Sequence, residues 1–172
     1  MFDKQPHLIG RLLELRPLRA SDFTSLMAAA SDPLIWKQHP HPRYREDVFG
    51  AFFADQLASG GGLVALDRPA GEVIGTSRFD RYDPGASEVE IGWTFLVRRC
   101  WGGAYNGEMK ALMLAHAFRD LEHVVLEVHR QNLRSQRAVE KIGGVRVGSR
   151  VDPDGRVLVV FRVSSNLRGI DH

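Results

Sequence analysis

The sequence of 172 residues has a single cysteine, almost no net charge and no long hydrophobic run. One cysteine cannot form an internal disulfide, which excludes a secreted disulfide scaffold and favours a reducing compartment. The longest aliphatic runs have about five residues, whereas a membrane-spanning helix needs about 20. Lys and Arg number 23 against 21 Asp and Glu, and a formal charge of +2 does not by itself argue for nucleic acid. We therefore expect a cytoplasmic protein without a membrane span and without a nucleic-acid partner.

The chain has the length of one domain, and it shows no internal repeat, low-complexity segment or linker. We assign a single domain to residues 8–163, with terminal extensions at 1–7 and 164–172. Strands are predicted at 12–16, 63–67, 72–82, 87–97, 124–128, 145–151 and 156–163, and helices at 21–31, 46–58, 104–121 and 133–142. This order predicts a mixed α/β (α+β) fold around one central sheet.

The predicted strand 87–97 alternates between apolar residues and a second, mostly polar set. Strict alternation puts Val89, Ile91, Trp93, Phe95 and Val97 on one face, and Glu88, Glu90, Gly92, Thr94 and Leu96 on the other. We therefore expect two carboxylates on the face opposite the apolar one.

The segment 98–106 (RRCWGGAYN) connects this strand to a predicted helix that begins at Ala104. The first amides of a helix lack intrahelical partners and carry partial positive charge, so they attract anions. The small residues at 102–104 let backbone amides close on a phosphate, and Arg98 or Arg99 could add charge. Such a glycine pair is more often only a tight turn, and the segment matches neither the nucleotide P-loop nor the three-glycine dinucleotide fingerprint.

A second motif, Asn132–Gly143 (NLRSQRAVEKIG), begins thirty residues after Gly102. The R-x-x-G-x-A turn before one helix and the N-x-x-S-x-x-x-x-E-K-x-G segment at the next resemble the GNAT N-acetyltransferase superfamily. Leu15–Arg19, with Asp22, and Glu90–Trp93 (EIGW) are similar to its ribosomal-protein N-terminal acetyltransferase (RimJ/RimL-like) branch. The resemblance covers about residues 8–163 and implies a GNAT-like fold, a central, mostly antiparallel, splayed sheet flanked by helices.

The resemblance implies that acetyl-coenzyme A (acetyl-CoA) is the co-substrate and that no metal takes part. Amides around the 99–104 turn would hold its pyrophosphate, and the strands 87–97 and 124–128 would splay to admit the pantetheine arm. The strand end at 95–97 and Asn132 would contact that arm, and Arg134 and Arg137 would meet the 3′-phosphate. The expected cofactor-binding residues are Phe95, Leu96, Val97, Arg98, Arg99, Trp101, Gly102, Gly103, Ala104, Tyr105, Asn106, Asn132, Arg134, Ser135 and Arg137.

Attack of an amine on a thioester needs a base for the amine and an acid for the departing thiolate. Many members of the superfamily place a tyrosine seven residues after the asparagine as the acid, but Val139 holds that position here. Ser135 is the remaining candidate. Glu90 is the first candidate for the base, with a solvent-facing or ion-paired carboxylate as the alternative. His129 is the second, because histidine titrates near neutrality, although a loop histidine is more often incidental.

The acceptor amine is expected near residues 37–45, where the family's first two helices border the acceptor site. Trp36, His39 and Tyr44 are the candidate substrate residues there, together with Glu88, which with Glu90 would suit a cationic acceptor. The two histidines of the His-Pro-His-Pro segment have no neighbouring cysteine, so we expect no metal site.

The resemblance implies direct transfer of an acetyl group to a primary amine. The acceptor could be a protein N-terminal α-amine, for example of a ribosomal protein, or a small-molecule amine. One alternative is a catalytically silent acyl-CoA-binding regulatory module, which the missing tyrosine permits. Another is an RNA- or ribosome-binding protein that uses the basic residues of 130–150. Dimers are common in the branch, which leaves a homodimer open, as are the acceptor and the acyl-chain preference.

Overall fold

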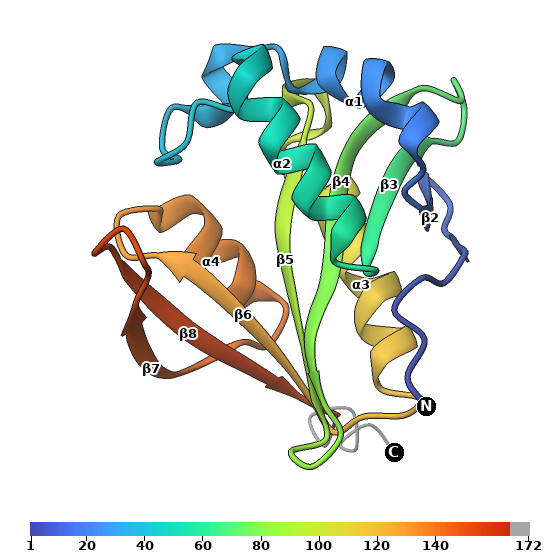
Figure 1. The fold of residues 1–172 in the computed structure, drawn as a ribbon. Coiled ribbons are helices and arrows are strands. Elements are labelled where there is room, and N and C mark those ends of the chain that lie inside the picture. Colours follow the sequence, from blue (N-terminus) through green and yellow to red (C-terminus); the bar gives the residue numbers. More distant parts are fainter. Residues whose placement is uncertain (166–172) are drawn as a thin grey trace.

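The computed structural model describes residues 1–165, which form one eight-stranded sheet with helices on both faces (Figure 1). The strands are β1 (Leu8–Ile9), β2 (Leu13–Pro17), β3 (Gly62–Asp67), β4 (Val73–Asp83), β5 (Glu88–Leu96), β6 (His123–His129), β7 (Val145–Val151) and β8 (Val157–Ser164). Their order across the sheet is β1-β2-β3-β4-β5-β6-β8-β7, and only β5 and β6 pair in parallel. The expected mixed, mostly antiparallel sheet is confirmed.

Four helices pack on this sheet and divide the core into two clusters of buried side chains. The helices are α1 (Phe23–Ala30), α2 (Glu46–Ala58), α3 (Ala104–Ala117) and α4 (Leu133–Lys141). Phenylalanines of α2 join α1 in one cluster, whereas α3 and α4 contribute to the other, together with buried residues of β5, β6 and β8. Helix α3 ends before the predicted Leu121, because the amides of Arg119 and Asp120 turn back to carbonyls three residues earlier. Within the described residues, no helix is long and apolar enough to cross a bilayer.

The strict alternation expected along β5 is wrong, because a β-bulge at Trp93 reverses it. The pairing register against β4 shifts at this point, and Trp93 has a left-handed φ of 52°. Before the bulge, Val89 and Ile91 belong to the cluster of α3 and α4. Beyond it, Phe95 belongs to the cluster of α1 and α2, and Leu96 returns to the first. One extra residue therefore moves three apolar side chains, Trp93, Phe95 and Leu96, to the face opposite the one that the pattern predicts.

Strands β5 and β6 part soon after they meet, as expected for a splayed sheet. Their parallel pairing joins Glu88–Glu90 to His123–Val125 and extends no further, and the two ribbons then diverge toward α4 and the α1–α2 connection (Figure 1). Beyond this point β5 stays paired with β4, and β6 stays paired with β8. The inner edges of both strands consequently carry backbone groups that no neighbouring strand satisfies.

The chain before β1, expected as an extension, lies against the domain. The Phe2 ring meets Phe79 edge-on with centroids 5.2 Å apart, and His116 Nε2 donates to Asp3 O at 2.7 Å. Phe2 is buried in the cluster that contains α3. Of the expected C-terminal extension, Ser164 ends β8, and residues 166–172 lie outside the described part of the chain.

Helix α3 is tied to the N-terminal strands by one carboxylate. Glu108 accepts hydrogen bonds from the backbone amides of Arg11, Leu12 and Leu13 at 2.7, 2.8 and 2.9 Å. Burial acts to raise the pKa of this carboxyl, but the three amides and the charge of Arg11 outweigh it and lower the pKa. The contact fixes the start of α3, and with it the preceding turn, against the edge of the sheet.

We expect Glu108→Gln to lower the free energy of unfolding by about 1–3 kcal/mol, since bonds to a charged acceptor are replaced by bonds to a neutral one. Urea denaturation at pH 7 should show a lower midpoint at an unchanged slope. Because the pKa is lowered in the fold, the difference from wild type should hold at neutral pH and shrink only as the pH falls below 4.5 and through this lowered pKa. The control is Glu140→Gln on the exposed face of α4, and equal effects of the two substitutions would contradict this role.

Candidate active site

The turn between β5 and α3 presents a row of free backbone amides. The amides of Cys100 and Trp101 are used within the 3₁₀ turn Arg98–Cys100, and the amide of Gly107 donates to Gly103 O at 2.7 Å. The five amides between them, at residues 102–106, donate to no acceptor within residues 1–165. Consecutive free amides at a helix N-terminus, with the partial positive charge of the helix, form an anion-binding site. That this segment holds a phosphate group stays a prediction, and these free amides are the groups that would bind it.

The two glycines of this turn are required by the backbone path. Gly102 and Gly103 have φ values of 107° and 112°, a region that side chains disfavour. Space is not the constraint, because a Cβ at either position would meet no described atom within 4 Å. The glycines therefore serve to let the chain turn sharply into α3 with its first amides exposed.

The two arginines expected to add charge to this turn are instead paired with carboxylates. Arg98 Nε donates to Asp32, and the Arg99 guanidinium lies 3.3 Å from Asp67 and 3.2 Å from Glu72. The Tyr105 hydroxyl also donates to Asp67, at 2.9 Å. These side chains fix the turn to β3, to the start of β4 and to the 3₁₀ turn after α1, so charge for an anion must come chiefly from the amides.

The second predicted motif is brought next to this turn by Trp101. The Arg134 guanidinium lies over the Trp101 indole, 3.7 Å from the ring centre, and Trp101 Nε1 donates to Leu96 O at 2.9 Å. One aromatic side chain thus joins the first turn of α4, the end of β5 and the glycine turn. Arg137, further along α4, is exposed.

The N-terminus of α4 is capped by the side chain of Asn132. Asn132 Oδ1 accepts a hydrogen bond from the Ser135 amide at 3.2 Å. The Ser135 hydroxyl makes no hydrogen bond with any residue of the described range, so it is free to meet a ligand. Val139, at the position where the superfamily often has tyrosine, is buried in the core. Ser135 and Val139 therefore differ in environment, and only the serine lies in the first turn.

At the end of β5, the backbone amide of one residue, Leu96, points toward the gap between β5 and β6. The Val97 amide donates to Ile74 O at 2.8 Å, so it is committed to β4. Strand alternation then directs the Leu96 amide away from β4, toward the side from which β6 has parted. The Phe95 side chain is buried against Trp36, with ring centroids 5.1 Å apart. Of the three residues expected to bond the pantetheine arm, Leu96 has the matching backbone orientation.

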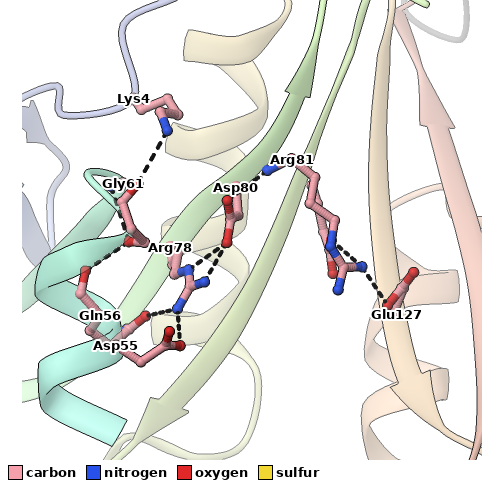
Figure 2. Close-up of polar contacts among 10 residues, drawn as sticks. Lys4, Asp55, Gln56, Gly61, Arg78, Asp80, Arg81 and Glu127 are labelled. Atoms are coloured by element: carbon pink, nitrogen blue, oxygen red, sulfur yellow. Dashed lines mark hydrogen bonds and ion pairs between the residues drawn. The ribbon is translucent and has the colours of Figure 1, made fainter. Parts of the chain in front are cut away.

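Glu90 occupies the last paired position before β5 and β6 part, and it is almost fully buried. Its carboxylate lies 2.9 Å from Arg81 Nη1, and the same nitrogen donates to Glu127 on β6 at 3.1 Å. Figure 2 shows the Arg81 side chain reaching across from β4 toward Glu127. Arg150 on β7 donates to the same glutamate from the other side, with Nε 2.6 Å from Oε1. Two carboxylates and two guanidiniums consequently form one network across four strands.

This network separates the pKa values of the two carboxyl groups. Burial, reinforced by the negative charge of Glu127, raises the pKa of Glu90 to about 7, although Arg81 and Arg150 oppose the rise. Burial also acts to raise the pKa of Glu127, but its hydrogen bonds with Arg150 and Arg81 outweigh it and lower the pKa. Glu127 holds the charge, and Glu90 can exchange a proton near neutral pH. A titratable pair separated in this way is a recurring feature of acid–base sites.

His129, the second candidate base, lies at the far end of the same region. It is four residues beyond Val125, the partner of Glu90, which corresponds to roughly 13 Å along β6. Burial, before any charged neighbour, lowers its pKa. Its ring meets His39 edge-on with centroids 5.9 Å apart, so it contacts the loop 37–45 rather than Glu90.

Three of the four predicted substrate residues gather at one open pocket of about 560 Å³. Trp36, His39 and Tyr44 line it together with Leu34 and Lys37. Burial, with a further contribution from the charge of Arg43, lowers the pKa of His39 to about 3, so this histidine is neutral near pH 7. Among the described residues, no group of three or more His, Cys, Asp or Glu side chains could hold a metal ion.

The fourth predicted substrate residue lies elsewhere. Glu88 stands where β5 begins and is still paired with β6, and it accepts a hydrogen bond from Arg162 at 3.1 Å. Glu88 and Glu90, which we expected to suit a cationic acceptor, each have an arginine partner, so neither carboxylate is a free negative charge.

Sequence reasoning missed the residues that complete this site from other strands. Arg81, Glu127 and Arg150 carry no local motif, and only the pairing of the strands from β4 to β7 across the sheet brings them to Glu90.

Lys110 was missed as well. It is buried on α3, where burial lowers its pKa to about 8, and it donates to Thr94 in the bulge at 2.9 Å. A lysine among the inward positions of a predicted helix was the one available signal.

Comparison with known proteins places the chain in a family. Residues 12–145 match the model of the acetyltransferase (GNAT) domain, and the chain therefore belongs to the GNAT acetyltransferase family. No curated protein sequence matches it.

Several solved structures share the fold. A protein from T. thermophilus assigned as an acetyltransferase is 30% identical, with a TM-score of 0.78 over 96% of this chain and 93% of the other. A GCN5-related N-acetyltransferase from Brucella melitensis is 22% identical, with a TM-score of 0.85 over 96% and 81%. Mycobacterium smegmatis RimJ, solved with CoA-disulfide, is 18% identical, with a TM-score of 0.75 over 98% and 92%.

The coupling of the two carboxyl groups can be measured directly. NMR titration of the carboxyl carbons should give Glu90 a midpoint near 7 in the wild-type protein. In Glu127→Gln the midpoint should fall, because the repelling charge is lost and Arg81 and Arg150 become free to favour the charged form of Glu90. The exposed Glu122→Gln should leave it unchanged. A Glu90 midpoint near 4.5 in all three proteins would show that the network does not act in this way.

Proposed function

We propose that this GNAT family member is an acetyl-CoA-dependent N-acetyltransferase that transfers the acetyl group directly to a primary amine. The observation that carries the proposal is the meeting of three features at the parting strands. These are a row of free amides, a backbone edge without a partner strand, and a buried carboxyl group that titrates near pH 7.

The residues around the glycine turn fit the requirements of the cofactor. A pyrophosphate needs several convergent donors, and the amides of residues 102–106 have no other partner in the described chain. The free amide of Leu96 would bond the pantetheine arm, and Asn132 would contact it while it continues to cap α4. Arg134, already stacked on Trp101, and the exposed Arg137 would meet the 3′-phosphate. The bound cofactor supplies an acetyl group activated as a thioester.

The chain's own acid–base groups would handle the protons of the transfer. Only a neutral amine is nucleophilic, and Glu90 in its charged form would accept the proton that the amine loses, directly or through water. A pKa near 7 suits this step, because a useful fraction is charged at neutral pH while the carboxylate remains basic enough to bind a proton.

The departing thiolate would be met by the first turn of α4. Its helix dipole favours negative charge, and the unpartnered hydroxyl of Ser135 would position the sulfur or a water beside it. Val139 packs in the core and supplies no proton. The acceptor would reach the site past the loop 37–45 and His129. One of the proteins with this fold is RimJ, which is consistent with a protein N-terminal amine as acceptor, and a small-molecule amine is the other source.

The cofactor site is tested by placing a carboxylate among the free amides. Wild-type protein should bind acetyl-CoA with micromolar affinity in calorimetric titration, and Ala104→Asp should bind it about 10²-fold more weakly because of like-charge repulsion. The helix itself should tolerate this change, since acidic residues stabilise a helix N-terminus. The matched control is Ala111→Asp on the exposed face of the same helix. Equal affinities in all three proteins would move the cofactor away from this turn.

The role of Glu90 is tested by the pH dependence of the rate. For wild-type enzyme, kcat/KM should rise with pH through about 7, because protonated Glu90 cannot accept a proton and only the charged form can. Glu90→Gln should lower kcat by about 10² and remove this rise, while acetyl-CoA affinity stays nearly unchanged. Because the amine substrate titrates in the same way with both enzymes, the difference between their two pH profiles reports on Glu90 alone. Cofactor binding without transfer to any amine would instead identify a silent acyl-CoA-binding module.

A further inference from the structure

The acceptor region contains one arginine without an anionic partner. Arg43, in the loop before α2, makes no side-chain hydrogen bond or ion pair with any residue between 1 and 165. Its guanidinium lies 4.1 Å from the centre of the Phe52 ring and 5.6 Å from that of Trp36. Its nitrogens are not fully enclosed by the described residues. Burial lowers its pKa to about 10, which leaves the group charged at neutral pH.

The acidic side chains near Arg43 and Glu90 bond to other arginines. Asp55 is close enough to Arg43 to favour its charge, but its Oδ2 accepts a hydrogen bond from Arg78 at 2.6 Å. Figure 2 shows Asp55 and Asp80 both directed at the Arg78 guanidinium. Glu90 has Arg81 as its partner. Within residues 1–165, Arg43 is therefore the one arginine of these three that bonds to no carboxylate.

Arg43 also lies over Trp36, one of the residues expected to contact the acceptor. The His39 ring connects this loop to the end of β6, because its centroid lies 5.5 Å from that of Trp36 and 5.9 Å from that of His129. Trp36, beneath the Arg43 guanidinium, packs on Phe95 at the end of β5. The guanidinium therefore lies between the loop 37–45 and the ends of the two strands that part.

We infer that the acceptor is an amine that carries a carboxylate near its reactive nitrogen, and that Arg43 binds this carboxylate. The inference rests on the proposed N-acetyltransferase function and specifies its substrate class. A guanidinium presents two parallel N–H groups that match a carboxylate, and a single arginine beside neutral histidines supplies one charge, which suits a monoanion. The carboxylate could belong to a free amino acid or to an acidic residue near a peptide N-terminus.

The test compares acceptors that differ only in this charge. One pair is L-methionine and L-methioninamide, and the other is Asp-Ala-Ala-Ala-amide and Asn-Ala-Ala-Ala-amide. Wild-type enzyme should favour the carboxylate member of one pair by about 30-fold or more in kcat/KM. The pair that shows this preference identifies whether the acceptor is a free amino acid or a peptide with an acidic residue near its N-terminus. Arg43→Gln should abolish that preference and leave the KM for acetyl-CoA within about twofold. Comparing preferences between enzymes cancels the different amine pKa values within a pair.

Two further variants separate a binding role from a structural one. Arg43→Lys keeps the charge and should retain part of the preference. Arg45→Gln removes an exposed arginine of the same loop that is paired with Asp47, and it should keep the wild-type preference. Thermal melts by circular dichroism establish that each variant folds. Wild-type preference retained in folded Arg43→Gln would overturn the inference.

A binding measurement keeps this inference distinguishable from the proposed function. The Arg43 Nε–H resonance is followed by NMR as propionate, or the neutral match propionamide, is added to the protein with coenzyme A. A saturable shift with propionate alone supports the site even if no amine is acetylated, in which case the transferase proposal fails by itself. No shift, or acetylation of neutral acceptors as fast as their carboxylate partners, overturns the inference and leaves the N-acetyltransferase proposal standing.

Discussion

The parting of β5 and β6 just after Glu90 is the constraint on which the rest of the site depends. Three residue pairs hold β5 and β6 together at one end. Beyond these pairs, β5 is paired only with β4, and β6 is paired only with β8. An unsatisfied strand edge is costly inside a protein, so a sheet that keeps two of them facing each other is built to receive a ligand. The free amides of residues 102–106 lie at the exit of β5, and the capped start of α4 lies at the exit of β6.

The bulge at Trp93 acts at the same place. It turns the end of β5 so that Phe95 packs against Trp36, just before the loop 37–45, while the amide of Leu96 points toward the gap between β5 and β6. Burial near this gap also raises the pKa of Glu90. A carboxyl group that shares Arg81 with a second carboxylate cannot be fully charged at low cost, and the one with fewer hydrogen bonds takes up the proton. The parting of the strands thereby also leaves a buried carboxyl group with a pKa raised to about 7.

Much of the fold could be predicted from the chain because its signals are local. Glycines at 102 and 103, the cap at Asn132 and the Asp-Pro-Asp-Gly turn before β8 act within a few residues, and the elements around them form where expected. The parallel meeting of β5 and β6 agrees with the resemblance to the superfamily. The face reversal along β5 could not be predicted, because a bulge depends on the pairing with β4 and leaves the alternating pattern of the sequence intact.

The sequence by itself determined which local features this protein contains: a glycine turn before a helix, a capped second helix, and a glutamate in the central strand. Only the tertiary structure decided what each charged group does. Arg98 and Arg99 are engaged by acids far away in the sequence, Glu90 is buried beside a second carboxylate, and Arg43 has no acidic partner in the described chain. The physical reason is that charge pairing depends on distances of a few ångströms between strands, and no sequence pattern encodes those distances.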